Sequence, residues 1–128
     1  MRPILLEIEA FGPYSDLQII DFTMLKDVNM FLIHGPTGGG KTTILDAISY
    51  ALYGDTSGNE RDGESMRSHF AKQDVLTQVK LTFKIRDNTY YVHRIPGQER
   101  PKKVGEGTTY QSADAQLYKI QDNKKQLI

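Results

Sequence analysis

The chain has 128 residues, which is enough for one hydrophobic core and too short for two domains. Hydrophobic residues make up 38% and charged residues 25%, a balance that excludes a disordered chain and indicates a globular one. Because there is no cysteine, these residues hold neither a disulfide framework nor a thiolate zinc site. No apolar run approaches the length that crosses a membrane. We therefore expect one domain over residues 1–128 of a cytoplasmic protein that does not bind a membrane.

The net charge is zero, but the two halves of the chain differ in sign. Residues 1–60 hold three Lys or Arg against eight Asp or Glu, and residues 61–128 hold thirteen against eight, so the halves carry −5 and +5. Such segregation can place a basic face on a neutral molecule. A solvated surface with chance clustering explains the same numbers, so charge alone leaves both interpretations open.

The first expected elements are two strands that form an antiparallel pair. Apolar residues alternate with other residues over 4–10, as in a strand with one buried face, and 17–23 has a similar character. The Gly-Pro pair within Phe11–Tyr14 predicts a turn between them. The continuous apolar run Met30–Ile33 is typical of a strand covered on both faces.

A helix over about 42–53 is predicted next, because apolar residues recur there at helical spacing and Gly54 stands where a glycine ends a helix. A polar loop over 55–63 and a short helix near 64–72 follow. Residues from about 75 to 128 are expected to be β-rich. The predicted parts are a strand at 79–86, a turn at 87–88, a strand at 89–95, a basic loop at 96–107, a strand at about 108–120, a turn at 122–123 and a strand from 126.

A glycine-rich segment between the apolar run and the helix fits the pattern Gly, four residues, Gly, Lys, Ser or Thr. Its residues are Gly35, Pro36, Thr37, Gly38, Gly39, Gly40, Lys41 and Thr42. A phosphate-binding (Walker A) loop has this pattern, leaves a buried strand and opens a helix. A glycine-rich turn without a ligand would have no need of Lys and Thr at this spacing. We therefore predict a phosphate loop at 35–43.

Each residue type in the loop has a physical task. Glycines allow the backbone N–H groups to curl around a phosphate, and the following helix adds about half a positive charge at its N-terminus. Lys41 is expected between the β- and γ-phosphates of ATP, Thr42 on Mg²⁺, and Thr43 near the α-phosphate. Hydrolysis also needs a second acidic motif, and the only similar run, Leu17–Asp21, is interrupted by a glutamine. We therefore expect no catalytic residue in this chain.

The sequence around the loop resembles the SbcC family, the ATPase subunits of bacterial complexes that process DNA double-strand breaks. The segments that carry the resemblance are Ala10–Tyr14, Ile20–Phe22, Leu45–Ile48, Ala51–Gly54, Met66–Ser68, Arg100–Lys103 and Gly105–Thr108. The resemblance implies an α/β fold, the N-terminal lobe of an ABC-ATPase head of the P-loop class, with a β-rich antiparallel part and few helices. It also implies that residues 1–128 are a truncated single domain.

In this family a long coiled coil separates the N-terminal half of the head from a C-terminal half that brings the signature and acidic motifs. The resemblance thus implies four partners: the C-terminal half of the same head, a second head in a homodimer, the nuclease partner SbcD, and the ends of double-stranded DNA. It implies ATP and Mg²⁺ as cofactors, a bacterial cytoplasm, and gating of DNA access to the nuclease. A DNA-tethering head of the structural-maintenance-of-chromosomes type remains an alternative, whereas a small-molecule kinase lacks a recognisable lid or acceptor site.

Basic residues in the second half are candidates for DNA contact. They are Arg94, Arg100, Lys102 and Lys103, with Lys80, Lys84 and Arg86 on one strand face. Such contacts would be salt-sensitive and independent of sequence, and a solvated strand face is the alternative. Two further features stay open: the loop Phe11–Tyr14, either near the nucleotide base or a plain turn, and Arg67, either at the nucleotide or second head or in a surface ion pair. Asp46 and the histidines (His34, His69, His93) are expected to have structural roles.

Overall fold

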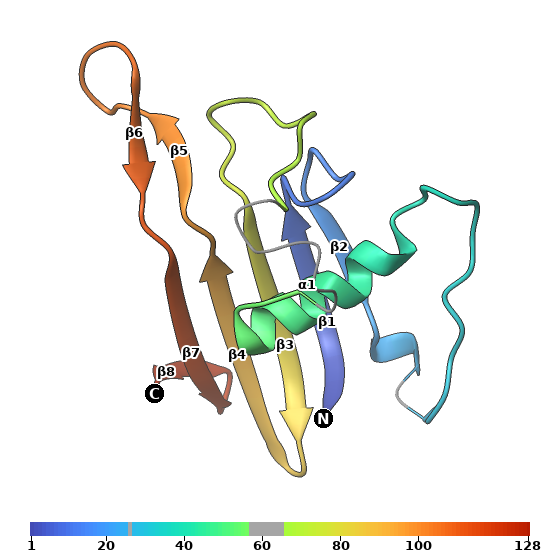
Figure 1. Ribbon diagram of the computed structural model, residues 1–128. Helices are drawn as coiled ribbons and strands as arrows, with labels where there is room; N and C mark the ends of the chain where they lie inside the picture. The colour runs from blue at the N-terminus through green and yellow to red at the C-terminus, as the bar shows by residue number, and fades with distance from the viewer. Residues whose placement is uncertain (26, 57–65) are drawn as a thin grey trace.

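The computed structural model describes residues 1–25, 27–56 and 66–128 (Figure 1). Within these residues it contains eight strands, one α-helix and a short 3₁₀ turn. In chain order they are β1 (Arg2–Glu9), β2 (Gln18–Asp21), η1 (Thr23–Leu25), α1 (Lys41–Tyr53), β3 (Gln78–Ile85), β4 (Asn88–Ile95), β5 (Gln98–Pro101), β6 (Thr108–Gln111), β7 (Asp114–Gln121) and β8 (Lys124–Leu127).

Six of the strands form one antiparallel sheet in the order β2-β1-β3-β4-β7-β8, and β5 and β6 form a separate hairpin. The register aligns Leu6 with Leu81 and Leu81 with Val92, so the apolar positions of three central strands share one face. The predicted antiparallel pair of the first two strands and the predicted hairpin of β3 and β4 are confirmed.

The core lies between the sheet and α1, which crosses the face of β1, β3 and β4 (Figure 1). Buried side chains of the strands meet the apolar stripe of the helix, and Phe11 at the end of β1 is fully buried, with its ring 6.0 Å from the ring of Tyr50. The buried members of this core are Leu6, Ile8, Phe11, Phe22, Ala47, Tyr50, Ala51, Met66, Val79, Leu81, Phe83 and Val92.

The helix has the bounds that the sequence predicts to within a residue, and a glycine stands at each end. Gly40 precedes it with φ 88° and Gly54 follows it with φ 80°, both in the left-handed region that favours glycine. The N–H of Gly54 donates to the carbonyl of Tyr50, which closes the last turn.

The prediction of a strand at Met30–Ile33 is wrong. The segment has no regular secondary structure, and the side chains of Met30 and Leu32 are 87% and 82% exposed. Among the described residues no strand pairs with this segment, and only part of it is covered: Ile33 is half-buried and the Phe31 ring lies 5.9 Å from the ring of the buried Phe22.

The prediction of a short helix near 64–72 is also wrong for its described part, because residues 66–72 form turns and an isolated bridge. Their backbone groups pair with the turn after β1: Gly12 N–H donates to the Met66 carbonyl, and Ser68 N–H to the Ala10 carbonyl. These bonds replace the intrahelical ones. Residues 57–63 of the predicted polar loop and residues 64–65 lie outside the described residues.

The β-rich half differs from the prediction in detail. The expected basic loop contains β5, the expected strand at 108–120 is divided into β6 and β7, and β8 begins at Lys124. The turn between β3 and β4 starts one residue early, at Arg86, whose φ is 53°. The turn at Asp122-Asn123 is confirmed, with positive φ at both residues as in a tight hairpin.

We predict that Leu81→Ala lowers the free energy of unfolding by about 2–5 kcal/mol, because it opens a cavity in the fully buried centre of the sheet. Leu45→Ala is the matched control, since this leucine of α1 is 56% exposed, and its effect should stay within about 1 kcal/mol. Urea denaturation followed by circular dichroism measures both. Equal losses for the two variants would contradict this assignment of the core.

Candidate nucleotide site

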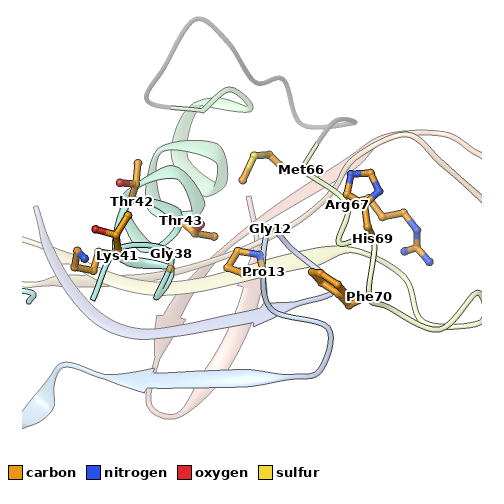
Figure 2. A pocket seen from close by; sticks show the side chains of 12 residues that line it. Gly12, Pro13, Gly38, Lys41, Thr42, Thr43, Met66, Arg67, His69 and Phe70 are labelled. Carbon is orange, nitrogen blue, oxygen red and sulfur yellow. The ribbon is translucent and has the colours of Figure 1, made fainter. Parts of the chain in front are cut away.

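A pocket of about 730 Å³ lies at the N-terminal end of α1. Three segments far apart in the sequence line it: the turn after β1, the glycine-rich loop with the first turn of α1, and residues 66–70. In Figure 2 Lys41 and Thr42 lie at one end, Arg67, His69 and Phe70 at the other, and Gly12 and Pro13 between them. The volume is in the range of pockets that hold small ligands and cofactors.

The glycine-rich loop turns back on itself before the helix begins. Gly38 has φ 82°, and the N–H of Gly39 donates to the carbonyl of Pro36 at 3.1 Å. The ammonium of Lys41 reaches back across the loop and donates to the carbonyls of Gly35 (2.7 Å) and Pro36 (2.8 Å). These two acceptors are neutral, and an anion would form stronger, charge-assisted bonds with the ammonium.

The N-terminus of α1 suits an anion for two reasons. As far as the described residues show, no side chain caps it, and its first turn holds no acidic residue. The N–H groups at the start of a helix have no intrahelical partner, and the helix dipole is positive there. Lys41 and Thr42 occupy this first turn, and Thr42 is exposed. The arrangement can therefore bind phosphate groups with a lysine charge and a threonine hydroxyl at hand.

The turn after β1 packs tightly against the phosphate loop. A Cβ added to Gly12, whose φ is 58°, would lie 2.7 Å from Cγ2 of the buried Thr43. The hydroxyl of Tyr14 donates to the carbonyl of Gly40 at 3.2 Å, and a Cβ on Gly40 would collide with the Tyr14 ring. The segment Phe11–Tyr14 is a tight turn, closed by backbone hydrogen bonds between Phe11 and Tyr14, and Tyr14 is half-buried in it and bonds to the phosphate loop. Contact of this turn with the nucleotide base stays a prediction.

The third side of the pocket is held by Arg67. Its guanidinium donates to four neutral acceptors: the carbonyls of Lys72 and Val75, Oγ1 of Thr77 and Oε1 of Gln98. These bonds close the segment between Met66 and β3 around one side chain. Arg67 lines the pocket, and within the described residues its guanidinium bonds to neutral groups of its own domain.

The remaining residues singled out in the sequence lie elsewhere, except His69, which lines the pocket. Asp46 is buried in α1. His93 shares a hydrogen bond with Gln78 on the sheet face away from α1, and its burial together with the nearby Lys80 lowers its pKa below the ordinary value. His34 is exposed.

The predicted DNA-contact residues do not form one patch. Arg94 lies on the helix side of the sheet, where its Nε donates to the carbonyl of Ala51 and its guanidinium carbon is 5.9 Å from the Tyr50 ring centroid. Burial raises the pKa of Tyr50 to about 12, although the Arg94 charge opposes the rise. Lys80 lies on the opposite face, because the register pairs Val79, and not Lys80, with Arg94.

The other three basic residues belong to the β5–β6 hairpin. Arg100 is half-buried, and its Nε donates to Oε1 of Gln111 on the facing strand. Lys102 and Lys103 are exposed beyond the end of β5. In Figure 1 this hairpin projects away from the sheet, at the end opposite the turn between β3 and β4. These two lysines are therefore the members of the set that are free to meet a large partner.

The whole β-rich part and the phosphate loop match one known family. The model of the AAA domain family matches residues 5–128. The chain belongs to the AAA domain family. Membership implies nucleotide binding, and the predicted α/β P-loop fold with a β-rich antiparallel part is confirmed.

The relatives confirm the resemblance to the N-terminal part of SbcC. The chain is 48% identical over 128 residues to the SbcC subunit of the SbcCD nuclease of Vibrio cholerae, covering all of this chain and 13% of that protein. For the same protein of Lactococcus lactis the identity is 45% over 117 residues, or 91% of this chain and 11% of that protein. For Staphylococcus epidermidis it is 38% over 127 residues, or 99% and 12%. The chain thus spans about an eighth of the length of these relatives.

The described part of the chain contains no helix of the length and apolar character that a membrane span requires.

Sequence reasoning missed several residues of the site. His69 and Phe70 line the pocket, and Thr77 and Gln98 hold Arg67 from beneath it. Met66-Arg67-Ser68 stood out only through the family resemblance. No periodicity marks these positions, because irregular backbone brings them to the site.

We predict that Gly12→Ala weakens both folding and nucleotide binding, because its Cβ would push Thr43 at the start of α1. Gly105→Ala is the matched control: its φ is 83°, yet a Cβ there meets nothing within 4 Å. Both variants carry the cost of a left-handed residue, about 1 kcal/mol, and only Gly12→Ala adds a collision. Thermal unfolding and ATP titration of both variants measure the difference. Indistinguishable variants would contradict the close packing of the turn on the loop.

Proposed function

We propose that this chain binds ATP and Mg²⁺ as the N-terminal half of an SbcC-type ATPase head. The observation that carries the proposal is the pocket that joins Lys41 and Thr42 to the walls at 12–13 and 66–70. Membership of the AAA family and the similarity to SbcC over the whole chain support the same conclusion.

Different residues of the loop would contact different phosphates of ATP. The backbone from Gly35 to Gly40 surrounds the phosphates, Lys41 leaves its carbonyl partners for the β- and γ-phosphates, and Thr43 lies near the α-phosphate. Mg²⁺ keeps several waters and takes one or two protein groups plus phosphate oxygens, so a single exposed hydroxyl, that of Thr42, suffices here. When bound, the metal would neutralise phosphate charge.

The exposed apolar residues before the loop favour a second half of the head. Met30 and Leu32 are more than four-fifths exposed and Phe31 about half, directly next to the phosphate loop. Contiguous apolar surface of this kind is typical of a contact with another protein part. We assign it to the C-terminal half of the same head, which would supply the signature and acidic motifs that hydrolysis needs. This chain alone is then expected to bind ATP without hydrolysing it.

The wider role follows from the name that these relatives share, the SbcC subunit of the SbcCD nuclease. We propose that ATP closes two heads on each other in a homodimer and so gates the access of double-stranded DNA ends to a nuclease partner, SbcD, in the bacterial cytoplasm. A DNA-tethering head without a nuclease is the alternative. The nuclease assignment is favoured because each of these relatives is named as part of a nuclease.

DNA contact is assigned to Lys102 and Lys103 at the hairpin, with Arg100 beside them. Arg94 is left out, because its guanidinium is bonded to α1. Exposed lysines bind phosphates as point charges and release counterions, which makes affinity depend on salt and not on base sequence.

We predict that Lys41→Ala lowers ATP affinity by at least about thirtyfold, because the charged hydrogen bonds to two phosphates are lost. Lys84→Ala, which removes an exposed lysine on the far side of the sheet, should leave the affinity unchanged. Isothermal titration with Mg²⁺-ATP measures both. Near-normal affinity of the Lys41 variant would overturn the site assignment.

We predict that the double variant Lys102→Ala, Lys103→Ala weakens binding to duplex DNA and flattens its salt dependence. Each lost phosphate contact removes about 0.9 from the slope of log K against log salt, so the slope should fall by about 1.8. Lys124→Ala, at the start of β8, is the control and should leave the slope unchanged. A double variant with the original slope would exclude the hairpin lysines from DNA contact.

A further inference from the structure

A buried polar cluster lies behind the pocket wall formed by residues 66–70. Its centre is Gln98, the first residue of β5, which is 6% exposed, together with Thr77, which is fully buried. The amide of Gln98 pairs with the backbone of Thr77 as a neighbouring strand would: Oε1 accepts the Thr77 N–H at 2.7 Å, and Nε2 donates to the Thr77 carbonyl at 2.9 Å. Nε2 also donates to the Pro96 carbonyl at 3.2 Å.

The same cluster reaches the pocket through Arg67. Oε1 of Gln98 accepts a second hydrogen bond, from the guanidinium of Arg67 at 3.2 Å, and Oγ1 of Thr77 accepts another at the same distance. On its other side the Thr77 hydroxyl donates to the carbonyl of Ala10 at 2.7 Å. That carbonyl also accepts the N–H of Ser68, and Gly12 N–H donates to the Met66 carbonyl. The wall and the turn after β1 are therefore joined to one cluster.

The wall depends on these contacts because it has no regular secondary structure of its own. Residues 66–70 form a turn and an isolated bridge between Phe11 and Arg67, and Met66 is buried while His69 and Phe70 face solvent. Arg67 fixes the segment to the backbone of Lys72 and Val75, and Gln98 is the one side chain from the hairpin that bonds to Arg67 within the described residues.

We propose that Gln98 is a positioning residue, which holds the 66–70 wall of the nucleotide pocket through Arg67 and Thr77 and so ties the β5–β6 hairpin to that pocket. The positioning of the wall stands on the hydrogen bonds alone. Its consequence for ATP rests on the proposed function. Lys102 and Lys103 belong to the same hairpin, so a partner that binds them and shifts β5 would also change the affinity of the pocket for a nucleotide. By linkage, a bound nucleotide would change the affinity of the hairpin for that partner.

An amide is the group that this position requires. A leucine of similar size would leave the buried N–H and carbonyl of Thr77 without partners, and a carboxylate would place an acceptor against the Thr77 carbonyl. Gln111, which pairs with Gln98 across the hairpin, offers a matched comparison. It is half-buried, bonds to Arg100 and lies outside the cluster.

The test compares Gln98→Leu with Gln111→Leu by hydrogen exchange of the full chain without nucleotide. We expect the amides of Gly12 and Ser68 to exchange about tenfold faster or more in Gln98→Leu, since their wall loses its anchor, while the β3–β4 amides keep their protection. Gln111→Leu should leave all of these amides unchanged. Loss of protection spread evenly over the sheet would reduce Gln98 to a general stabilising residue and overturn the proposal, as would unchanged exchange at Gly12 and Ser68.

A double-mutant cycle with Arg67→Ala tests the route. If Gln98 acts through Arg67, the Ser68 amide should exchange little faster in the double variant than in either single variant. If the two single-variant rate increases multiply in the double variant, Gln98 does not act through Arg67. Arg67→Ala alone carries the test if Gln98→Leu does not fold.

ATP titration then separates the two proposals. If Lys41→Ala leaves the ATP affinity unchanged, the ATP site is wrong, but the hydrogen-exchange result is unaffected. If Gln98→Leu speeds exchange in the wall but leaves the ATP affinity unchanged, the proposed link between Gln98 and the nucleotide pocket is wrong.

Discussion

The close approach of the turn after β1 to the first turn of α1 is the contact on which the rest of the structure depends. Gly12 lies where any side chain would strike Thr43, and Gly40 lies where any side chain would strike Tyr14. Each side of the contact therefore has a glycine with positive φ, and the backbone of that glycine packs directly on a side chain of the other side. The contact sets the start of α1 over the end of β1, and this placement orients the helix across the sheet and opens the pocket beside it.

The phosphate loop and its helix could be predicted because their chemistry fixes residue types at fixed spacing. The strands β3 and β4 could be predicted because each alternates along one buried face. The predicted strand at Met30–Ile33 was wrong for a physical reason: an apolar run indicates that a segment prefers to be buried, but it does not indicate which part of the protein covers it. The wall at 66–70 escaped prediction because side-chain bonds from Arg67, and not a repeating backbone pattern, define its shape.

The basic residues show how chain proximity differs from proximity in space. Arg94 and Arg100 are six positions apart, but one bonds to α1 and the other crosses the hairpin to Gln111. The period of two along a strand sends Lys80 to the face opposite Arg94 once the register is set. The net charge of each half of the chain does not show which basic residues lie together in space. Only the pairing of the strands reduces the candidate DNA surface to the two hairpin lysines.

The composition of the pocket sets a limit on its chemistry. Its cationic side chains are Lys41 and Arg67, with Arg67 already bonded to neutral acceptors, and the helix end adds only about half a charge. These charges together are smaller than the charge of a triphosphate, and the proposed Mg²⁺ would supply the difference. None of the twelve residues that line the pocket is Asp or Glu, so this set offers no carboxylate that could orient an attacking water. If hydrolysis takes place here, that group has to come from outside these twelve residues. The exposed apolar run beside the loop is where a second protein part could dock and bring it.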